Sequence, residues 1–474
     1  MKKSKKSYSP GTKTSPSAVG ARGRKLRVGV LFGGRSGEHE VSLLSAASVL
    51  SAIDPAKYDV VPIGLDKRGR WLTGAEAGRL LAGATPTLAG AEKARAVGEI
   101  AANAPPSQQS PSRAERSTSS GSAPTDAVFA AAAAVLRSGE NFEELRIPTA
   151  PPMRRATDLL QHAATAELAH PGSPLAASLD VVFPVLHGTF GEDGTVQGLF
   201  ELADIAYVGS GVLGSSAAMD KDAMKRLFAS AGLPQTPHIT VLRSQWRAEP
   251  KRMRKEIEAA LKYPIFVKPA NLGSSVGISK VHDRGELAAA MDLAASFDRK
   301  IVIEQGVAGQ GSDRLRAKPR ELEVSVLGND DPVASVVGEI VPNREFYDYA
   351  SKYEAAEEPS VPIIPAKLTK AQEKEIRAMA IAAFRACDCA GLARVDFLME
   401  PEDRAKKTSG KKSAKKSPRI FLNEINTMPG FTSISMYPKL WQASGLSYSK
   451  LIDRLIELAL ARHSERQQTR FTRA

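Results

Sequence analysis

The stretch RVDFLME (Arg394–Glu400), a lysine-rich segment and the stretch RIFLNEIN (Arg419–Asn426) follow one another near the end of the chain. Both stretches alternate apolar and polar residues, which is typical of half-buried strands. A polar segment between two such strands predicts a hairpin. Side chains two apart on a strand share a face, so Glu424 and Asn426 point the same way and the hairpin can set Asp396 opposite them.

Asp396, Glu424 and Asn426 supply two carboxylates and one amide oxygen. These hard oxygen donors are the set that magnesium prefers when it also bridges phosphates. The alternative is a surface hairpin whose acidic side chains are simply solvated. The hairpin taken alone does not decide between these two readings, so the rest of the chain has to.

Length and composition limit the class of protein. With 474 residues, 42% of them hydrophobic, the chain can form two or three domains with substantial cores. It has no run of 18 apolar residues and no apolar segment after its basic N-terminus, so we expect neither a membrane span nor a secretory signal. Cys387 and Cys389 lie two apart in an expected helix and make a poor disulfide or zinc pair, which fits a reducing, cytoplasmic setting.

The net charge of +13 invites a nucleic-acid hypothesis. Its distribution argues against one. Residues 1–27 hold nine Lys or Arg and no acid, and residues 401–418 hold seven against two acids. Without these two segments the chain is close to neutral, so the basic charge belongs to appendages. Solvated appendages are favoured over a loose electrostatic role, which stays open.

The N-terminal part has the pattern of a doubly wound domain. Residues 1–25 predict a disordered basic tail. An apolar strand at 26–32, a helix at 38–53 and a strand at 58–65 then form a βαβ start. From about 85 to 178 Ala, Pro and Ser dominate, which predicts a flexible insertion with short helices near 126–137 and 155–168. Order returns with a strand at 179–186.

A second region begins near residue 216. We expect a helix from Asp220 and strands at 263–269, 278–281 and 301–307. Thr369 and Gln372 form a capping box, and the helix that starts there is expected to run to Gly391.

The segment Asn271–Gly277 joins two of these strands. Its glycines flank two serines, so its backbone N–H groups can surround a phosphate, and Lys268 can extend toward the same group. It is not a Walker A loop, because no Gly-Lys-Ser/Thr follows. Such a loop taken alone is more often only a turn. Lys221 taken alone would be a solvated helix lysine, and the hinge after Glu304 is by itself a weak signal for an adenine site. The segment Phe346–Tyr353 holds four aromatic residues and predicts either a packed loop or a lid that excludes water.

Six motifs in this order resemble one family closely, the D-alanine–D-alanine ligases, which have the ATP-grasp fold. One motif alone would be weak, but six in the family's order are specific. Together they span the chain from residue 26 onward, apart from the insertions. The motifs are Leu31–Ser42, Leu186–Gly194, Lys268–Gly277, Phe346–Tyr353, Arg394–Asp396 and Asn423–Gly430.

The resemblance implies an α/β fold, α+β in part: an N-terminal doubly wound parallel-sheet domain followed by a two-lobed ATP-grasp domain. The expected divisions are a substrate domain at 26–215, a central lobe at 216–303, a C-terminal lobe at 304–462 and a tail at 463–474. The implied reaction joins two D-alanines through a D-alanyl phosphate to give D-alanyl-D-alanine for peptidoglycan precursors. ATP is the co-substrate, and two Mg²⁺ ions, for which Mn²⁺ can substitute, are the cofactors.

The resemblance also implies a role for each matched residue. Around ATP it places Lys221, Lys268, Gly273, Ser275, Glu304, Gln305, Val307, Glu321 and Lys352. On the metal ions it places Asp396, Glu424 and Asn426. The catalytic set is Glu38, Ser274, Tyr353, Arg394 and Gly430, where Glu38, Ser274 and Tyr353 form a hydrogen-bonded triad that fastens the lid and Arg394 stabilises the oxyanion with the Gly430 N–H. The substrates would also meet His187, Ser435 and Met436.

Three departures from the family pattern fall between motifs: the insertion at 85–178, the extra residues 310–318 and the long 401–418 loop. The second makes Glu321 less certain than Glu304. The nearest rivals are a D-alanyl-D-lactate and a D-alanyl-D-serine ligase, and Tyr353 favours the dipeptide. A degenerate ATP-binding module is disfavoured by the intact acidic and basic residues. D-alanine and ATP are the expected partners, with no nucleic acid or membrane, and the family tends to form homodimers.

Overall fold

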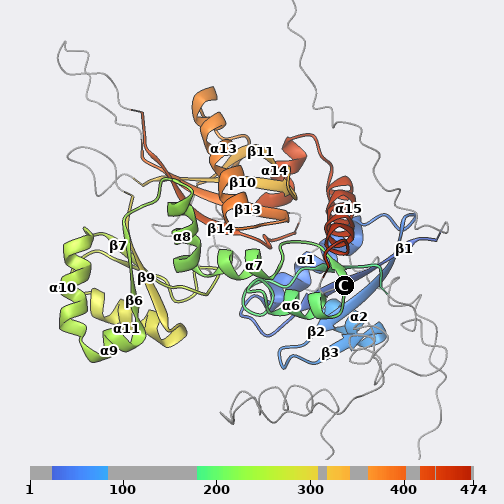
Figure 1. Cartoon of the computed structure of the whole chain (residues 1–474), viewed down its shortest axis with the longest axis horizontal. Helices are drawn as coiled ribbons and strands as arrows, with labels where there is room; N and C mark the ends of the chain where they lie inside the picture. Colours follow the sequence, from blue (N-terminus) through green and yellow to red (C-terminus); the bar gives the residue numbers. More distant parts are fainter. Residues whose placement is uncertain are drawn as a thin grey trace, which may run out of the picture.

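The computed structural model describes residues 24–83, 179–307, 318–341, 361–401, 417–432 and 434–470. Three β-sheets, each with its own helices, make up this part of the chain (Figure 1). The tail at 1–23 and the insertion at 85–178, with the short helices expected near 126–137 and 155–168, lie outside the described residues.

The first sheet is mostly parallel. In spatial order its strands are β3 (Trp71–Thr73), β2 (Tyr58–Leu65), β1 (Leu26–Gly33), β4 (Val181–Pro184) and β5 (Ala206–Tyr207). β1 pairs in parallel with β2 and β4, and β4 with β5, whereas the edge strand β3 runs antiparallel to β2. Val28, Val30 and Phe32 are fully buried, as expected for a strand inside a covered parallel sheet. The predicted doubly wound start is therefore confirmed.

Helices from both ends of the chain pack on this sheet. They are α1 (His39–Ala52), α2 (Gly74–Gly83), α6 (Thr195–Leu202) and α15 (Tyr448–Arg466). Leu451 and Leu455 of α15 are fully buried in the same apolar core as Val28. Asp453 of α15 also accepts hydrogen bonds from Lys57 Nζ (2.6 Å) and the Tyr58 hydroxyl (2.9 Å). The last helix thus returns to the N-terminal sheet.

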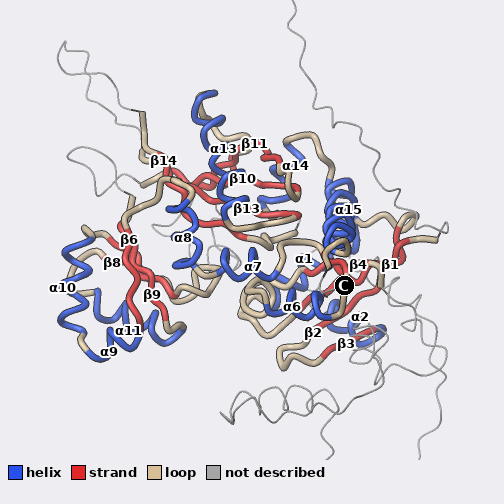
Figure 2. The backbone as a smooth tube through the Cα atoms, in the orientation of Figure 1, coloured by secondary structure: helices blue, strands red, loops and turns tan. Residues whose placement is uncertain are grey.

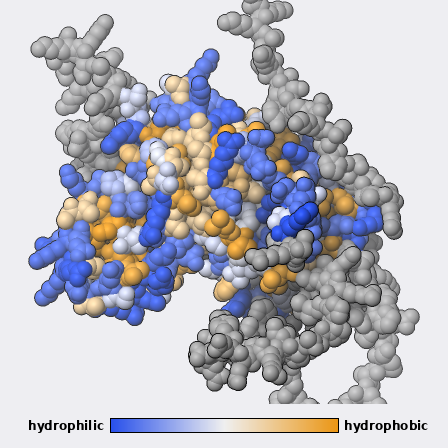
Figure 3. Space-filling view, in the orientation of Figure 1, coloured by the Kyte–Doolittle hydropathy of each residue, from blue (hydrophilic) through white to orange (hydrophobic). Residues whose placement is uncertain are grey.

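The second sheet is a small antiparallel one, in the lobe at the left of Figure 1. In order its strands are β6 (His238–Leu242), β9 (Lys300–Gln305), β7 (Ile265–Pro269) and β8 (Ser279–Val281). Its helices are α9 (Arg243–Ala248), α10 (Pro250–Ala260) and α11 (Leu287–Phe297). Val267, Ile301 and Ile303 form the centre of its core. Hydrophilic residues dominate the outer edge of this lobe (Figure 3).

The third sheet carries the hairpin and is also antiparallel. Figure 2 shows its strands as a layer beside the helix α13. In order its strands are β12 (Val361–Ile363), β11 (Val333–Val341), β10 (Arg320–Gly328), β13 (Gly391–Met399) and β14 (Ile420–Asn426). Its helices are α13 (Lys370–Ala386) and α14 (Met436–Ala443), while α7 (Val212–Met219) and α8 (Lys221–Ser230) connect it to the other sheets. The predicted hairpin is confirmed, because β13 pairs antiparallel with β14.

Two local expectations were wrong. The helix that begins after Thr369 ends at Ala386 rather than at Gly391, because Asp388, in a left-handed conformation (φ 54°), turns the chain directly after the C-cap residue Cys387. Gly391 instead opens β13. Cys387 is therefore the residue after the helix and Cys389 lies beyond it, not inside a helix. Both thiols are buried, and burial raises the pKa of Cys387 to about 12.

The division of the chain at 215/216 and 303/304 remains a proposal. The second of these divisions falls inside β9, which belongs wholly to the second sheet. In the parts of the chain that the structure describes, no helix has the length and apolar content needed to cross a membrane.

Candidate active site

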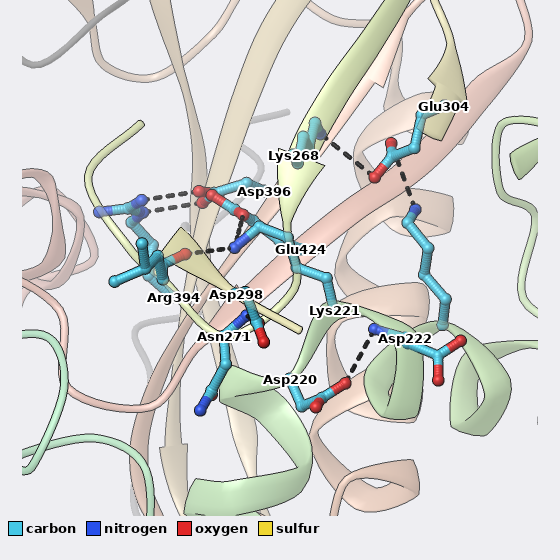
Figure 4. Close-up of polar contacts among 12 residues, drawn as sticks. Asp220, Lys221, Asp222, Lys268, Asn271, Asp298, Glu304, Arg394, Asp396 and Glu424 are labelled. Atoms are coloured by element: carbon cyan, nitrogen blue, oxygen red, sulfur yellow. Dashed lines mark hydrogen bonds and ion pairs between the residues drawn. The ribbon is translucent and has the colours of Figure 1, made fainter. Parts of the chain in front are cut away.

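The hairpin places its polar residues on one face of the third sheet. Asp396 lies opposite Glu424 and Arg394 opposite Asn426 in the β13–β14 register. Arg394 donates to both oxygens of the Asp396 carboxylate, through Nε (2.7 Å) and Nη2 (2.6 Å) (Figure 4). Its Nε atom also lies 3.3 Å from the Glu323 carboxylate. Burial acts to lower the pKa of Arg394, but Asp396 and Glu323 raise it well above its usual range. The arginine is therefore a fixed positive charge.

The three expected metal ligands fit a hard cation by their chemistry. The register brings the carboxylates of Asp396 and Glu424 together, and Asn426 lies on the same face two residues further on. The Asn426 Oδ1 atom accepts a hydrogen bond from the Met428 N–H (3.0 Å), which orients the amide. No cluster of three His, Cys, Asp or Glu side chains suited to a metal occurs among the described residues. A metal here would thus need the amide oxygen as its third protein donor.

Lys221 links the hairpin to the glycine-rich loop. It is the first residue of α8, which Asp220 caps by accepting from the N–H groups of Asp222 and Ala223. Its Nζ donates to the Leu272 carbonyl (2.6 Å) and lies 3.9 Å from Glu424, with the side chain almost wholly buried (Figure 4). One lysine thus contacts both the hairpin and the segment that precedes Gly273.

A buried carboxylate lies between two more lysines. Glu304, near the end of β9, is 3.4 Å from Lys225 Nζ of α8 and 3.2 Å from Lys268 Nζ of β7. Burial alone would raise the pKa of Glu304, but the two lysines together lower it to about 2. We call Lys225, Lys268 and Glu304 the lysine–carboxylate cluster. Burial lowers the pKa of Lys225, and the charge of Glu304 opposes this shift. With both lysines protonated, the two cations exceed the one anion and the cluster carries a net positive charge.

The loop Gly273–Gly277 has the backbone of an anion-binding turn. Ser274 and Ser275 both have positive φ (51° and 61°), as does Gly277 (70°). Such left-handed residues cost free energy and gather at ligand-binding sites, and successive residues of this kind turn backbone N–H groups toward one point. A Cβ atom on Gly273 would lie 3.0 Å from Glu38 Oε1, so Glu38 reaches this loop.

Glu38 comes from the turn between β1 and α1 and is buried. A Cβ atom on Gly188 would lie 3.2 Å from its Oε1 atom, the same oxygen that a Cβ on Gly273 would approach. Nearby, the His187 ring bonds to Ser45 Oγ through Nε2 (2.9 Å) and to the Met428 carbonyl through Nδ1 (3.0 Å). Because a carbonyl only accepts, Nδ1 carries the proton, and burial lowers the pKa of His187 and keeps the ring neutral.

Glu192 is a second buried acid beside Glu38. Its Oε1 accepts the Gly188 N–H at 2.7 Å. Burial, reinforced by the negative charge of Glu38, raises its pKa well above the usual range. Two neighbouring acids with different environments are thus placed at the end of the first sheet.

The loop between β14 and α14, residues 427–435, forms the last part of the site. Gly430 lies against Ser435, since a Cβ on Gly430 would be 2.9 Å from Ser435 Oγ. Ser435 precedes α14 and bonds through Oγ to Thr432, at its N–H (3.1 Å) and its hydroxyl (2.8 Å). The Met436 side chain packs in an apolar core, so only its backbone N–H, at the start of the helix, can meet a substrate anion.

Most of the expected site residues come together at this meeting of three sheets. Glu321 shares a face of β10 with Glu323, which pairs with Asp396. Gln305 accepts the Lys262 N–H (3.0 Å), and Val307 follows β9. Lys352 and Tyr353 lie outside the described residues, so their placement stays a prediction.

Sequence reasoning missed Lys225, Glu192 and Glu323. A signal for Lys225 was present: residues 221, 224, 225 and 228 have the spacing of a helix's apolar stripe, yet two of them are lysines. Glu192 lay within a motif that was noted, but nothing in the sequence indicated its burial.

Two antiparallel sheets that meet at lysines, a glycine-rich loop and an acidic hairpin define an ATP-grasp enzyme. Family models agree: residues 27–210 match the D-ala D-ala ligase N-terminus, and residues 227–457 match the D-ala D-ala ligase C-terminus. A D-alanine–D-alanine ligase of Heliobacterium modesticaldum is 42% identical over 94% of this chain and 97% of its own. One of Geobacillus kaustophilus is 42% identical over 94% and 98%.

Two solved structures are similar in fold and sequence. The VanG D-Ala:D-Ser ligase of Enterococcus faecalis has a TM-score of 0.62 and 31% identity, covering 92% of this chain and all of its own. The D-alanine–D-alanine ligase of Coxiella burnetii has a TM-score of 0.61 and 31% identity, covering 94% and 96%. The chain belongs to the D-alanine–D-alanine ligase family, ATP-dependent ligases of peptidoglycan synthesis.

Proposed function

We propose that this chain joins two D-alanine molecules, with hydrolysis of ATP to ADP and phosphate, at the meeting point of its three sheets. The observation that carries the proposal is the β13–β14 register: it sets Asp396 against Glu424 while Lys221 ties Glu424 to the loop at Leu272. Acidic ligands for a cation and basic groups for phosphates therefore lie side by side.

ATP binds between the second and third sheets in this proposal. Lys221, Lys268 and the backbone of Gly273–Ser275 meet the phosphates, and Lys352 reaches them from the lid segment. Glu304, Gln305, Val307 and Glu321 surround the adenosine. The support is the positive lysine–carboxylate cluster next to a loop with left-handed backbone, since both features favour a polyanion.

The family uses magnesium, and the chain's own donors suit it. Asp396, Glu424 and Asn426 would hold two Mg²⁺ ions, with Mn²⁺ as a substitute. Bound there, the ions would neutralise phosphate charge. Arg394 fixes the Asp396 carboxylate from one side, which presents its remaining lone pairs to the ions.

The first D-alanine binds with its ammonium near Glu38. Its carboxylate oxygen attacks the γ-phosphorus and the bond to ADP breaks, which gives D-alanyl phosphate. The amine of the second D-alanine then attacks the acyl carbon, loses a proton, and phosphate leaves. Arg394 and the Gly430 N–H stabilise the oxyanion, and Ser435 with the Met436 N–H receives the second carboxylate.

In this scheme His187 positions neighbouring segments and takes no part in proton transfer. Both of its ring nitrogens bond within the protein, to Ser45 and to the carbonyl of Met428. It thereby holds the loop after β14 against the first sheet, beside the first substrate. Ser274 follows Gly273, which Glu38 approaches, and in this proposal it forms with Glu38 and Tyr353 the triad that fastens the lid.

The second substrate is the finer question, because VanG, a D-Ala:D-Ser ligase, is among the similar structures. The relatives that share 42% identity with nearly the whole chain are D-alanine–D-alanine ligases, which favours D-alanine as the second substrate. The proposal assigns the chain to the cytoplasm, where its substrates are made.

Phosphate release from ATP tests the proposal directly. Purified protein with magnesium is offered D-alanine alone, or D-alanine with D-serine, D-lactate or L-alanine, and the products are identified by mass. We expect phosphate release with D-alanine alone and D-alanyl-D-alanine as the main product at neutral pH. A main product that contains D-serine or D-lactate would contradict the assignment of the second substrate.

A further inference from the structure

Lys225 is a cation that the proposed chemistry does not use. Its side chain is wholly buried, although α8 lies at the junction of two sheets. Its backbone carbonyl accepts from Gln235 Nε2 (2.9 Å), which fixes this turn of the helix. Lysine is almost never fully buried unless it is paired, so its position calls for a partner.

The partner of Lys225 is Glu304, at 3.4 Å, and Glu304 is shared with Lys268. Phe266 lies opposite Glu304 in the β7–β9 register, so Lys268, two residues further on, points to the same face. The carboxylate therefore lies between one lysine from the helix α8 and one from the neighbouring strand β7, and Figure 4 shows its contact with Lys268.

The two lysines differ in exposure. Lys225 has no exposed surface, while 11% of the Lys268 side chain is exposed. Neither Lys225 Nζ nor Glu304 Oε1 has a hydrogen bond of normal geometry within the described part of the chain. The Thr236 hydroxyl donates to the other carboxylate oxygen, Oε2, at 3.4 Å. The carboxylate is thus held by this one hydrogen bond and by the charge of the two lysines.

If Glu304 had only one cationic neighbour, its carboxylate would keep that neighbour in a permanent ion pair. If Lys225 were neutral, Lys268 would be the only cation beside a buried anion, and moving it away would leave the anion uncompensated. With Lys225 present, the cluster keeps one positive charge in excess, and Lys268 is the member that can extend toward solvent or a ligand.

We propose that Lys225 is a positioning residue for nucleotide binding: it supplies the counter-charge of Glu304 and so leaves the Lys268 ammonium available to the phosphates of ATP. This inference rests on the proposed ATP site. It adds Lys225 as a residue that contacts no part of the nucleotide but balances the charge of Glu304 beside Lys268, two residues that the proposal places at the nucleotide.

The test replaces Lys225 by methionine, which keeps the length of the side chain and removes its charge. The matched control is Arg226→Met, one residue along the same helix, where the side chain is 74% exposed. We expect Lys225→Met to raise the KM for ATP about tenfold, the effect of roughly one lost charge-assisted contact. The kcat and the KM for D-alanine should change less than threefold.

The pH profile separates positioning from a general structural defect. Without Lys225, burial should raise the pKa of Glu304 from about 2 toward neutrality. The KM for ATP of Lys225→Met should therefore fall toward the native value as the pH falls from 8 to 5.5, because a Glu304 that takes up a proton no longer holds the Lys268 ammonium. The native protein should show a flat profile over the same range.

A second variant keeps the test decisive if Lys225→Met folds poorly. Lys225→Met/Glu304→Gln leaves no uncompensated charge in the interior, so it should fold and should release Lys268. Its KM for ATP should be lower than that of Lys225→Met alone. Whether or not that variant folds, the double variant should have a KM for ATP within threefold of that of Glu304→Gln alone, because Lys225 acts only through Glu304.

Two results would overturn the inference. One is a folded Lys225→Met protein with the native KM for ATP and the native pH profile. The other is a double variant whose KM for ATP is no lower than that of Lys225→Met, or differs more than threefold from that of Glu304→Gln. If the native protein itself did not depend on ATP, the proposed function would fail instead, so the two failures are distinguishable.

Discussion

Buried charges give the site its character at the scale of single residues. Arg394 on Asp396, the two lysines on Glu304, and Glu192 beside Glu38 are each held where water is largely excluded. In such surroundings an unpaired charge is costly, so each of these residues depends on its partner. Perturbed ionisable groups gathered at one place are a recognised mark of functional sites.

His187 gives a pH prediction at this scale. Its pKa is lowered by burial from the ordinary 6.5, so the unfolded chain binds a proton that the folded protein does not. Its contribution to stability is therefore full above pH 6.5 and is lost as the pH falls through the lowered value. Melting temperatures from pH 7.5 to 5.5 should fall for the native protein and fall less for His187→Gln. The exposed His282→Gln variant should behave as the native protein, and equal slopes in all three would refute the prediction.

The hairpin residues allow a second prediction. Glu424→Gln keeps the shape of the side chain but removes a negative charge that faces the proposed ions. We expect it to lower turnover more than about 100-fold, the upper range seen even for outer-shell partners of metals, and to weaken the magnesium dependence of ATP binding. Asn426→Ala should be milder, because a neutral donor is lost. Normal turnover and normal magnesium dependence in Glu424→Gln would show that the hairpin holds no metal.

At the scale of elements, local pattern predicted much of the fold. The strands β1 and β2 and the β13–β14 hairpin follow from runs of apolar or alternating residues, and the capping box at Thr369 starts α13 as expected. The end of that helix did not follow, because the left-handed residue that ends it is Asp388, where glycine is the usual signal, while Gly391 opens the next strand. The burial of Glu192 could not be foreseen either, since it depends on how separate elements pack, whereas the position of Lys225 in the apolar stripe of α8 was a signal that went unused.

Two glycines of neighbouring elements test this packing. A Cβ on Gly191 would lie 2.2 Å from the Leu186 carbonyl oxygen, whereas one on Gly198, within α6, would meet nothing within 4 Å. Gly191→Ala should lower the free energy of unfolding by about 1–3 kcal/mol, as overpacking does. Gly198→Ala should raise it by about 0.5–1 kcal/mol, since alanine is the better helix former. Urea denaturation measures both, and a native-like Gly191→Ala would be inconsistent with the loop packing.

At the scale of the whole molecule, the chain closes on itself. α15 shares a core with the first sheet, and Asp453 bonds to Lys57 and Tyr58 across nearly the full length of the sequence. His187 and Ser45 bond to the loop after β14 in the same way. The site therefore requires the first and the last parts of the chain together.

The basic appendages should be dispensable by this account. Residues 1–23 and 402–416 carry much of the net charge of +13. Neither segment contains an expected site residue, although the second lies within the hairpin. Arg24, which bonds to Asp180 (2.6 and 2.7 Å), is kept. Deleting 1–23 and shortening the loop should leave turnover within a few-fold, because closure entropy changes little with loop length. Collapse of turnover in a variant with a native melting temperature would place the appendages in the site.

The central claim is that the first D-alanine is activated as an acyl phosphate at the meeting point of the three sheets. The most direct measurement follows oxygen-18 from D-alanine labelled in its carboxylate. Attack of that carboxylate on the γ-phosphorus, followed by cleavage of the acyl carbon–oxygen bond, transfers one labelled oxygen to phosphate. We predict one oxygen-18 in each phosphate released with dipeptide. Phosphate without label, formed at the rate of dipeptide synthesis, would contradict the account.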